Sequence, residues 1–337
     1  MNPRLSVILP VFNRVPLLRH PLDSLRSMQE ASADRLSWEV IVVDDGSVED
    51  VSGILTAYSG LPIHLHRLQK NSGLLRARLE GLALAGGEAV MFLDADDAIA
   101  PGKFEAMLDA LADADVVHGD MARRAIDCDG RASGPLRFDP PSAPVHSPAE
   151  FYLRLQPAPH NPIFRRDYLQ AAIASPVCPP DRNYDSIAET WFYYHLALRP
   201  ARIACRPGAW SIVGEPDGER LSRKWERQYA ASVRLMEAFL AGLPVNEDTL
   251  EARRQIGLAA FAAWRALPHG FPSSDRLLAI WRRCPPVSLA RLGGSTFARA
   301  ARLLGPVLAG RLFRRLQRPP YARIRTVTPD ELKGLFA

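Results

Sequence analysis

The amino-acid sequence predicts an α/β fold in which a mostly parallel sheet is flanked by helices. Short apolar runs rich in Val, Ile and Leu alternate with segments of helical periodicity over residues 5–97. The connections between them are short, as in sheets whose strands are joined by helical crossovers. Several runs end in acidic or other polar residues, and ligands of open α/β sheets bind just beyond the carboxyl ends of the strands.

The first two strands are predicted at residues 5–10 and 39–43, where apolar and β-branched side chains dominate. Between them, leucines and a methionine recur at helical spacing and predict a connecting helix. Pro16 suits the opening turn of this helix, whereas Pro21 would lie inside it. Because an interior proline removes a backbone hydrogen bond, we expect a late start or a kink.

The next elements repeat this alternation. Residues 63–68 alternate apolar and polar side chains, which predicts a half-exposed strand. A helix is predicted over 74–85 and a fourth, buried strand over 90–93, while 115–118 is a candidate for a further strand. The order β-α-β-β-α-β is typical of a mostly parallel sheet.

The most informative segment is Val-Met-Phe-Leu-Asp-Ala-Asp-Asp at residues 90–97, a buried-strand pattern that breaks into three carboxylates. Magnesium and manganese suit such ligands, and magnesium typically binds one or two carboxylates together with substrate phosphate and water. An EF-hand calcium loop is excluded, because Ala98 and Ile99 stand where that loop needs a ligand and a glycine. A simple acidic turn is the structural alternative, so the metal interpretation depends on the neighbouring loops.

Three predicted strand ends converge on one edge of the sheet, at residues 10–14, 44–47 and 94–97. Carboxylates after the second strand can accept hydrogen bonds from a base or a ribose. Arg78 on the following helix can engage base or phosphate oxygens with its planar donors. Each feature alone has a structural explanation, such as an ordinary Asp-Gly turn. Together they match the needs of a nucleotide-diphosphate ligand.

Four segments resemble the motifs of glycosyltransferase family 2, in the family's order and spacing. They are residues 6–13, 39–47, 71–78 followed by Gly81, and 92–97 with Pro101. The resemblance covers roughly the first 105 residues. It implies a GT-A fold and transfer of a sugar from a nucleotide diphosphate, with inversion at the anomeric carbon.

The resemblance also implies a domain organisation. A glycosyltransferase domain would occupy residues 1–224, with a donor half at about 1–126 and an acceptor half at about 149–224. The proline-rich stretch between the two halves is expected to be an irregular connection. A helical, arginine-rich region would follow at 225–337.

The resemblance assigns roles to individual residues. Asp94 and Asp96 would be the D-x-D pair that holds Mn²⁺ or Mg²⁺, with Asp96 the more direct ligand. Asp44 or Asp45 would contact the base or ribose, assisted by Arg78. The nucleotide-sugar contacts that it implies are Pro10, Val11, Asn13, Asp44, Asp45, Arg78, Asp94 and Ala95. UDP-sugars are the favoured donors, and a glycan or lipid-linked glycan hydroxyl is the implied acceptor.

The general base is where the sequence departs from the family. A carboxylate must lie within about 3 Å of the attacking hydroxyl. In the family it comes from a Glu-Asp pair before an aromatic-rich helix, but here Thr190 follows Glu189. A threonine hydroxyl cannot act as a base at neutral pH. Glu189 is the first candidate, Asp185 one helical turn earlier is the second, and loss of catalysis at this position is the third. The structural alternative for Glu189 is a first-turn acid that favours the helix dipole.

Other residues have two interpretations each. His160 is either a contact to acceptor or phosphates or an ordinary loop residue. Trp191, Tyr193 and Tyr194 either stack on sugars or belong to the core. The arginines of segment 220–223 either grip the diphosphate or form a surface charge pair.

Composition suits a cytoplasmic enzyme. The 337 residues can bury a large core and carry an appendage. The four cysteines have neither metal-ligand spacing nor a disulfide framework. No signal peptide or membrane-spanning apolar run is evident.

The C-terminal region suggests a membrane partner. Residues 282–325 contain eleven arginines and no acidic residue, interleaved with apolar side chains. That composition is expected of a segment lying on an anionic membrane surface, here the inner face of the cytoplasmic membrane. The alternative is a helical appendage with solvated arginines. Nucleic acid is not expected, since no recognition fold accompanies the charge.

Two rival functions follow from the same residues. A nucleotidyltransferase would need a glycine-rich loop after the first strand, and residues 10–14 lack one. A catalytically impaired nucleotide-sugar-binding protein is the more serious alternative because of Thr190.

Overall fold

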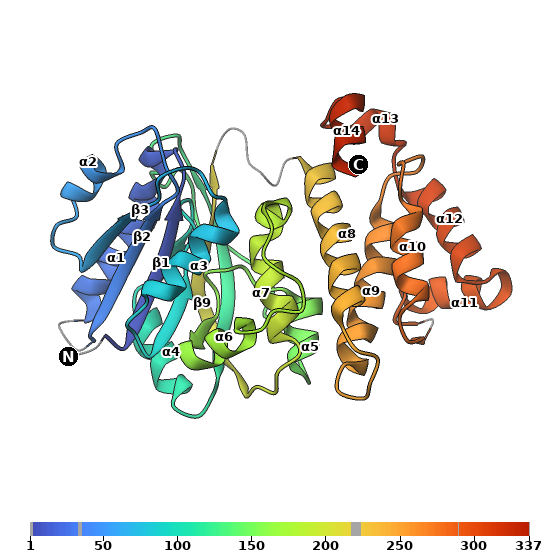
Figure 1. Ribbon diagram of the computed structural model, residues 1–337, viewed down its shortest axis with the longest axis horizontal. Coiled ribbons are helices and arrows are strands. Elements are labelled where there is room, and N and C mark those ends of the chain that lie inside the picture. The colour runs from blue at the N-terminus through green and yellow to red at the C-terminus, as the bar shows by residue number, and fades with distance from the viewer. Residues whose placement is uncertain (1–2, 33–35, 217–223, 289, 337) are drawn as a thin grey trace. The chain divides into compact units, whose positions relative to one another are not determined.

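The structure, a computed structural model, describes residues 3–32, 36–216, 224–288 and 290–336 (Figure 1). Arg220 and Arg223, considered above as possible diphosphate contacts, lie outside the described residues.

The chain divides into two compact units. The first contains most of residues 1–219. The second contains residues 220–337 together with the segments 149–155 and 177–179. The segment 149–155 therefore groups with the C-terminal helices, although the sequence analysis assigned it to the acceptor half.

A nine-stranded mixed sheet forms the centre of the first unit, in the order β3-β2-β1-β4-β8-β6-β9-β5, with β7 paired to β6. The strands are β1 (Leu5–Val11), β2 (Trp38–Asp44), β3 (Ile63–Arg67), β4 (Ala89–Phe92), β5 (Ala98–Ile99), β6 (Val116–Ile126), β7 (Arg137–Phe138), β8 (Ile163–Arg165) and β9 (Ile203–Pro216). The first four are parallel and confirm the strands predicted there. The candidate strand at 115–118 is the start of β6, which pairs antiparallel with β8 and parallel with β9.

Helices and helical turns cover both faces of this sheet (Figure 1). They are η1 (Val15–Leu18), α1 (Arg19–Ser32), α2 (Val51–Thr56), α3 (Leu74–Leu84), α4 (Lys103–Leu111), α6 (Arg166–Ile173), η3 (Arg182–Ile187) and α7 (Ala188–Leu196). The helix before β2 starts late, as predicted: a 3-10 turn comes first, and Pro21 is the third residue of α1. The short helix α2 was not predicted; Asp50 caps it by accepting a hydrogen bond from the Gly53 N–H.

Successive side chains of β1 point to opposite faces of the sheet, and different helices pack on the two faces. Val7 and Leu9 belong to a core that includes side chains of α1 and α4. Ile8 points to the other face, where α3 packs so closely that a Cβ on Gly81 would lie 2.3 Å from the Ile8 Cγ2 atom. Phe192 of α7 contacts Phe92 at the end of β4, with ring centroids 5.2 Å apart. The helices α3 and α7 therefore lie next to the strand ends that carry the predicted site.

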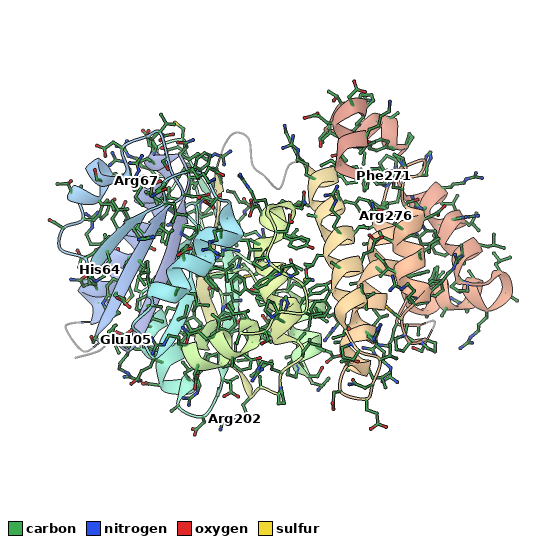
Figure 2. The ribbon with its side chains drawn as sticks, in the orientation of Figure 1. His64, Arg67, Glu105, Arg202, Phe271 and Arg276 are labelled. Carbon is green, nitrogen blue, oxygen red and sulfur yellow. The ribbon has the colours of Figure 1, made fainter. Side chains whose placement is uncertain are left out.

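The second unit is helical, as predicted for the region after residue 225. Its elements are α5 (Pro148–Glu150), the π-helical turn η2 (Phe151–Leu155), α8 (Trp225–Gly242), α9 (Leu250–Ala266), α10 (Asp275–Arg282), α11 (Gly294–Leu304), α12 (Pro306–Gln317), α13 (Tyr321–Ile324) and α14 (Pro329–Phe336). Two of its residues, Phe271 and Arg276, are labelled in Figure 2. Phe271 packs edge-on against Tyr229 and Tyr321, and Arg276 pairs with Glu237. Among the described helices, none has the length and apolar character needed to cross a membrane.

Candidate active site

The carboxyl ends of β1, β2 and β4 lie side by side, because β1 pairs in parallel with both of the other strands. Val11 is opposite Asp44 at the ends of β1 and β2, and Ile8 is opposite Phe92 at the end of β4. The Asp45 N–H extends this ladder by donating to the Val11 carbonyl oxygen (2.8 Å). The three loops singled out from the sequence therefore meet at one edge of the sheet.

Asn13 joins the loop after β1 to the loop after β2. Its φ of 52° lies in the left-handed region, which asparagine tolerates better than most residues. Its N–H donates to the Ser47 hydroxyl (2.8 Å), and its side-chain oxygen accepts from the Val48 N–H (2.9 Å). Pro10 and Val11 precede it as buried residues of β1. Asn13 thus fixes the position of one loop against the other.

Asp44 is fully buried and bonded within its own loop. Its Oδ1 accepts from the Ser47 N–H (2.8 Å), and its Oδ2 lies 3.5 Å from Nε of Arg67. Arg67, labelled in Figure 2, also donates to the Ser47 carbonyl oxygen (2.7 Å) and keeps its side chain largely exposed. No motif or local pattern in the sequence marks Arg67 as a site residue. The signal that could have found it is the parallel register, which pairs Arg67 with Asp44.

Asp45 bonds to a different part of the chain. Its two carboxylate oxygens accept from the Ser72 N–H (2.6 Å) and the Gly73 N–H (2.8 Å). These amides lie just before α3, so Asp45 ties the loop after β2 to the start of that helix. Asp44 and Asp45 are adjacent in sequence, yet one organises its own loop and the other organises the neighbouring one.

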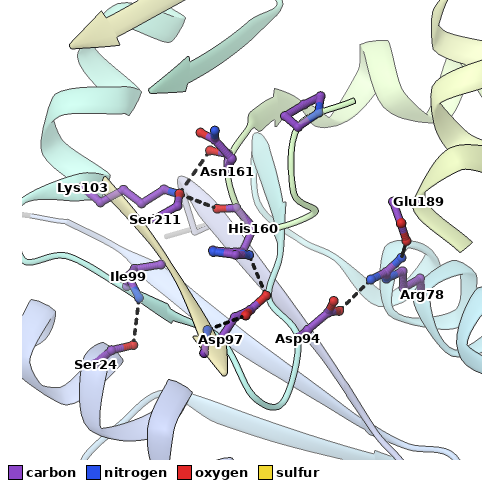
Figure 3. Close-up of polar contacts among 12 residues, drawn as sticks. Ser24, Arg78, Asp94, Asp97, Ile99, Lys103, His160, Asn161, Glu189 and Ser211 are labelled. Atoms are coloured by element: carbon purple, nitrogen blue, oxygen red, sulfur yellow. Dashed lines mark hydrogen bonds and ion pairs between the residues drawn. The ribbon is translucent and has the colours of Figure 1, made fainter. Parts of the chain in front are cut away.

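Arg78 is fully buried between two carboxylates (Figure 3). Its Nη2 donates to Asp94 Oδ1 (2.6 Å) and its Nη1 to Glu189 Oε2 (3.2 Å). Burial alone would lower the pKa of the Arg78 guanidinium, but the two carboxylates outweigh it and raise that pKa above its usual value. The described partners of Arg78 are thus the β4 loop and α7, rather than Asp44 or Asp45.

Glu189 lies in the first turn of α7 and keeps about a third of its side chain exposed. Arg78 holds Glu189 close to Asp94, although the two carboxylates are 95 positions apart in the sequence. The ion pair with Arg78 fixes the position of the Glu189 carboxylate. Because the carboxylate is still partly exposed to solvent, it can also receive a proton.

Asp185 lies in the turn η3, before α7, and faces the start of α3. Its Oδ1 accepts from the Leu75 N–H (3.1 Å), one of the first amides of that helix. Burial raises the pKa of the Asp185 carboxyl, while the Leu75 N–H and Arg182 reduce that effect. The carboxylate also lies over Gly73, where a Cβ would fall 2.1 Å from Oδ2. Asp185 and Glu189 therefore both face α3, about one helical turn apart.

The acidic loop after β4 is held from two sides. The Asp97 N–H donates to the Asp94 carbonyl oxygen (3.1 Å), which closes a tight turn around Ala95 and Asp96. On the β9 side, the Gly214 N–H donates to Asp97 Oδ1 (3.0 Å). The side chains of Asp94, Ala95 and Asp96 remain half-exposed, whereas Asp97 is buried. Asp94 and Asp96 are therefore accessible to a ligand, whereas Asp97 anchors the loop.

A buried polar layer lies beneath this loop (Figure 3). His160 is fully buried, with Nδ1 2.8 Å from Asp97 Oδ2. The Lys103 ammonium, also fully buried, donates to the His160 carbonyl oxygen, to the Asn161 carbonyl oxygen (3.1 Å) and to the Ser211 hydroxyl (2.7 Å). Burial lowers the pKa of Lys103 to about 7. His160 is thus neither a simple loop residue nor exposed to a substrate, because it lies under the acidic loop.

The aromatic residues of α7 belong to the core. Trp191, Tyr193 and Tyr194 are all nearly completely buried. Tyr193 donates its hydroxyl to the Pro157 carbonyl oxygen (2.7 Å). The core interpretation of these residues is therefore confirmed.

Comparison with known proteins identifies the family. Residues 6–172 match the model of glycosyl transferase family 2. The glycosyltransferase YwdF of Bacillus subtilis is 34% identical over 117 residues, which are 35% of this chain and 41% of that protein. TuaG of Bacillus subtilis, whose name assigns it to teichuronic acid biosynthesis, is 36% identical over 110 residues, or 32% of this chain and 42% of that protein. The chain thus spans about two fifths of the length of these relatives.

Solved structures share the fold over most of the chain. Residues 1–349 of Staphylococcus aureus TarS match with a TM-score of 0.59 and 20% identity, over 93% of this chain and 90% of that chain. The mannosyltransferase PcManGT of Pyrobaculum calidifontis matches with a TM-score of 0.56 and 20% identity, over 94% and 84%. These likenesses confirm the predicted α/β architecture with a helical C-terminal region. The matched motifs, their convergence on one sheet edge and the family model agree that residues 6–172 of this chain form a domain of glycosyltransferase family 2.

Proposed function

We propose that this protein transfers a sugar from a nucleotide-diphosphate sugar to a hydroxyl group of a glycan, with inversion at the anomeric carbon. The observation that carries the proposal is the Arg78 guanidinium, which binds Asp94 after β4 and Glu189 in α7. One buried arginine thereby joins the candidate donor loop to the candidate base. A displacement reaction needs these two groups close together, on either side of the reacting carbon.

For the donor, a UDP-sugar is our first candidate and a GDP-sugar our second. TarS has been solved in complex with UDP-GlcNAc, and PcManGT in complex with GDP-Man and Mn²⁺. The base and ribose would lie at the loops of Asp44 and Asp45, where the exposed guanidinium of Arg67 offers donors to a base carbonyl. Pro10, Val11 and Asn13 would form the neighbouring wall of this pocket.

A divalent cation fits the acidic loop. Asp96 and Asp94 would hold Mn²⁺ or Mg²⁺, with Ala95 between them against the donor. Within the described residues, no group of three or more His, Cys, Asp or Glu side chains could hold a metal by itself. The half-exposed carboxylates of Asp94 and Asp96 suit an ion that completes its coordination with substrate phosphate and water. When bound, the cation stabilises the charge that develops on the leaving diphosphate.

Glu189 would serve as the general base. The acceptor hydroxyl attacks the anomeric carbon from the side opposite the diphosphate. The bond from that carbon to the diphosphate oxygen breaks, and the hydroxyl proton passes to Glu189. Arg78 keeps the Glu189 carboxylate oriented, as a positioning residue. Asp185 would instead cap α3, because its Oδ1 already accepts the Leu75 N–H.

The acceptor is assigned only by chemical class. The name of TuaG connects that relative to teichuronic acid, a polysaccharide. We therefore favour a hydroxyl of a cell-envelope glycan, free or lipid-linked.

Ligand-induced thermal stabilisation tests the donor site without an acceptor. A nucleotide sugar at 100 times its Kd should stabilise the fold by about 2.7 kcal/mol, which raises Tm by several degrees. We expect this shift with UDP-sugars in the presence of Mn²⁺ and its loss in Asp96→Ala. No shift with any UDP-, GDP- or dTDP-sugar would contradict the proposal.

The substitution Glu189→Gln tests the base. We expect kcat to fall by about 10²–10⁴, because proton removal is lost, while the donor-induced thermal shift is retained. Asp185→Asn is the matched comparison: it should reduce stability through a weakened helix cap, with a smaller effect on kcat. Wild-type protein that binds the donor but shows no turnover with any acceptor or water would instead favour a nucleotide-sugar-binding protein.

A further inference from the structure

The second unit exposes a leucine- and arginine-rich face on α11 and α12. These helices meet at Gly305, whose φ of 77° lies in the left-handed region that glycine adopts without strain. The sharp corner lets both helices pack on α9. The exposed residues of α11 and α12 lie on their other sides.

The inner side of α11 and α12 packs closely against the rest of the second unit. Gly310 of α12 approaches Trp264 so closely that a Cβ would lie 2.3 Å from that ring. The guanidinium of Arg265 stacks over the ring of Phe297 in α11, with its Cζ atom 4.1 Å from the ring centroid. Arg314 is buried and donates to the Pro268 carbonyl oxygen (2.9 Å). These contacts fix which side chains of the two helices point outward.

The outer side carries an unusual number of exposed leucines. Twelve large apolar side chains are exposed in the described chain, and five of them fall within residues 303–316. They are Leu303, Leu304, Leu308, Leu312 and Leu316, with exposed fractions of 87%, 47%, 58%, 45% and 75%. The last three recur every four residues and form one stripe along α12. Single exposed leucines are ordinary, but a contiguous row marks an interaction surface.

Arginines surround this leucine stripe. The exposed ones in this part of the chain are Arg299, Arg302, Arg311, Arg315, Arg318, Arg323 and Arg325. The ion pairs described in the second unit use other basic residues, namely Arg154, Arg227, Arg254, Arg276, Arg291 and Lys333. Because residues 282–325 contain no acid, α11 and α12 contribute only positive charges to this face.

A groove borders the stripe on its α10 side. It has a volume of about 510 Å³ and is lined by Leu308, Arg311, Leu312 and Arg315 from α12, with His269 and Phe271 opposite. Asp275 is the carboxylate among its lining residues. Apolar side chains and arginines thus alternate both on the stripe and in the groove beside it.

We propose that the outer face of α11 and α12 binds the surface of an anionic lipid membrane. Leucines at this spacing can enter the boundary between headgroups and acyl chains, while the arginines remain at the level of the lipid phosphates. Charge complementarity selects this occupant, because a second copy of the chain would bring the same positive face against it. The unit would then lie on the membrane rather than cross it, in keeping with its short helices.

Flotation with lipid vesicles tests the proposal on the full chain. The wild-type protein should bind vesicles of equal parts phosphatidylglycerol and phosphatidylcholine, and binding should fall as salt is raised. It should not bind phosphatidylcholine alone. Arg311→Gln with Arg315→Gln should weaken binding roughly 30-fold, and Leu308→Ser, Leu312→Ser and Leu316→Ser together at least 10-fold.

Matched controls use exposed residues outside this face. Arg131→Gln with Arg206→Gln removes two exposed arginines, and Phe138→Ser with Val245→Ser removes two exposed apolar side chains. Both control variants should bind vesicles like the wild type. Thermal melting, with and without a nucleotide sugar, shows that each variant is folded and that the donor site is unaffected.

Three results would overturn the proposal. They are equal binding of the wild type to charged and neutral vesicles, no binding to either, and undiminished binding by the stripe variants. If the leucine substitutions convert a dimer to a monomer in sedimentation experiments while vesicle binding persists, the face is a subunit contact instead. None of these outcomes depends on sugar transfer, so the proposed function can stand or fail separately.

Discussion

At the scale of single residues, Arg78 ties together two distant parts of the first unit. It is charged, completely buried and bonded to two carboxylates that come from distant parts of the chain. A buried charge without partners is strongly destabilising, so each of the three groups depends on the other two.

The substitution Arg78→Met measures this dependence. It leaves the Asp94 and Glu189 carboxylates close together without the cation, so the free energy of unfolding should fall by about 2–3 kcal/mol. The loss is smaller than for a fully buried ion pair, because both carboxylates are partly exposed to water. Donor binding and kcat should both decrease. Urea denaturation and initial-rate kinetics are the measurements. Arg76→Met is the control on the same helix: its arginine is exposed and its partner Glu80 half-exposed, so the loss of this ion pair should cost ~0–1 kcal/mol. Equal effects of the two substitutions would contradict this account.

Single residues also show where sequence reasoning reaches its limit. The polar loops after β1, β2 and β4 could be predicted, because each follows an apolar run directly in the chain. That Arg78 bonds to Glu189 could not, because the two are 111 positions apart and no local pattern links them. Arg67 was missed for a similar reason: its pairing with Asp44 depends on strand register.

At the scale of elements, the segments around Lys103 connect the acidic loop to the rest of the sheet. Lys103 is the first residue of α4 and forms no ion pair within the described part of the chain. It donates to the carbonyl oxygens of His160 and Asn161 and to the Ser211 hydroxyl in β9. Three acceptors match the three N–H groups of an ammonium. The sequence did not signal this arrangement, since a lysine at the start of a helix is ordinarily exposed.

Lys103 should make stability depend on pH. Its pKa is about 7 in the folded protein and 10.5 ordinarily. Between these values the unfolded chain binds more protons, so stability should rise with pH, by at most about 1.4 kcal/mol per pH unit. Below about pH 7 the contribution is flat, because both states hold the proton. Urea denaturation from pH 6 to 10.5 should therefore show a steeper rise in the wild type than in Lys103→Met. Parallel curves for the two proteins would rule out this titration.

At the scale of the whole molecule, the two compact units do not divide the sequence at one point. The described residues from 224 onward belong to the second unit, and so does the much earlier segment 149–155. Phe151, Tyr152 and Leu153 are buried there, where η2 packs on α9. An irregular connection was predicted before this segment, and the chain from residue 127 to 147 indeed has little regular structure apart from β7.

A fragment that ends at residue 224 should therefore be poorly behaved. It would expose the three apolar side chains of η2, because α9 would be absent. We expect lower solubility and stronger binding of an apolar dye such as ANS than for the full chain. Replacing Phe151, Tyr152 and Leu153 by serine within the fragment should restore solubility. A soluble, dye-free fragment without these replacements would show that η2 finds its partners within the first unit.

The loops after β1 and β2 and the turn before α3 form a connected frame. Asn13 bonds to Ser47 and Val48, Asp45 bonds to the amides before α3, and Asp185 bonds to the first turn of that helix. A ligand that enters such a frame need not pay for ordering the loops, since their conformational entropy has already been given up on folding. The nucleotide part of a donor should accordingly bind with a small entropic penalty, and most of the ordering on binding should fall on the sugar and the acceptor.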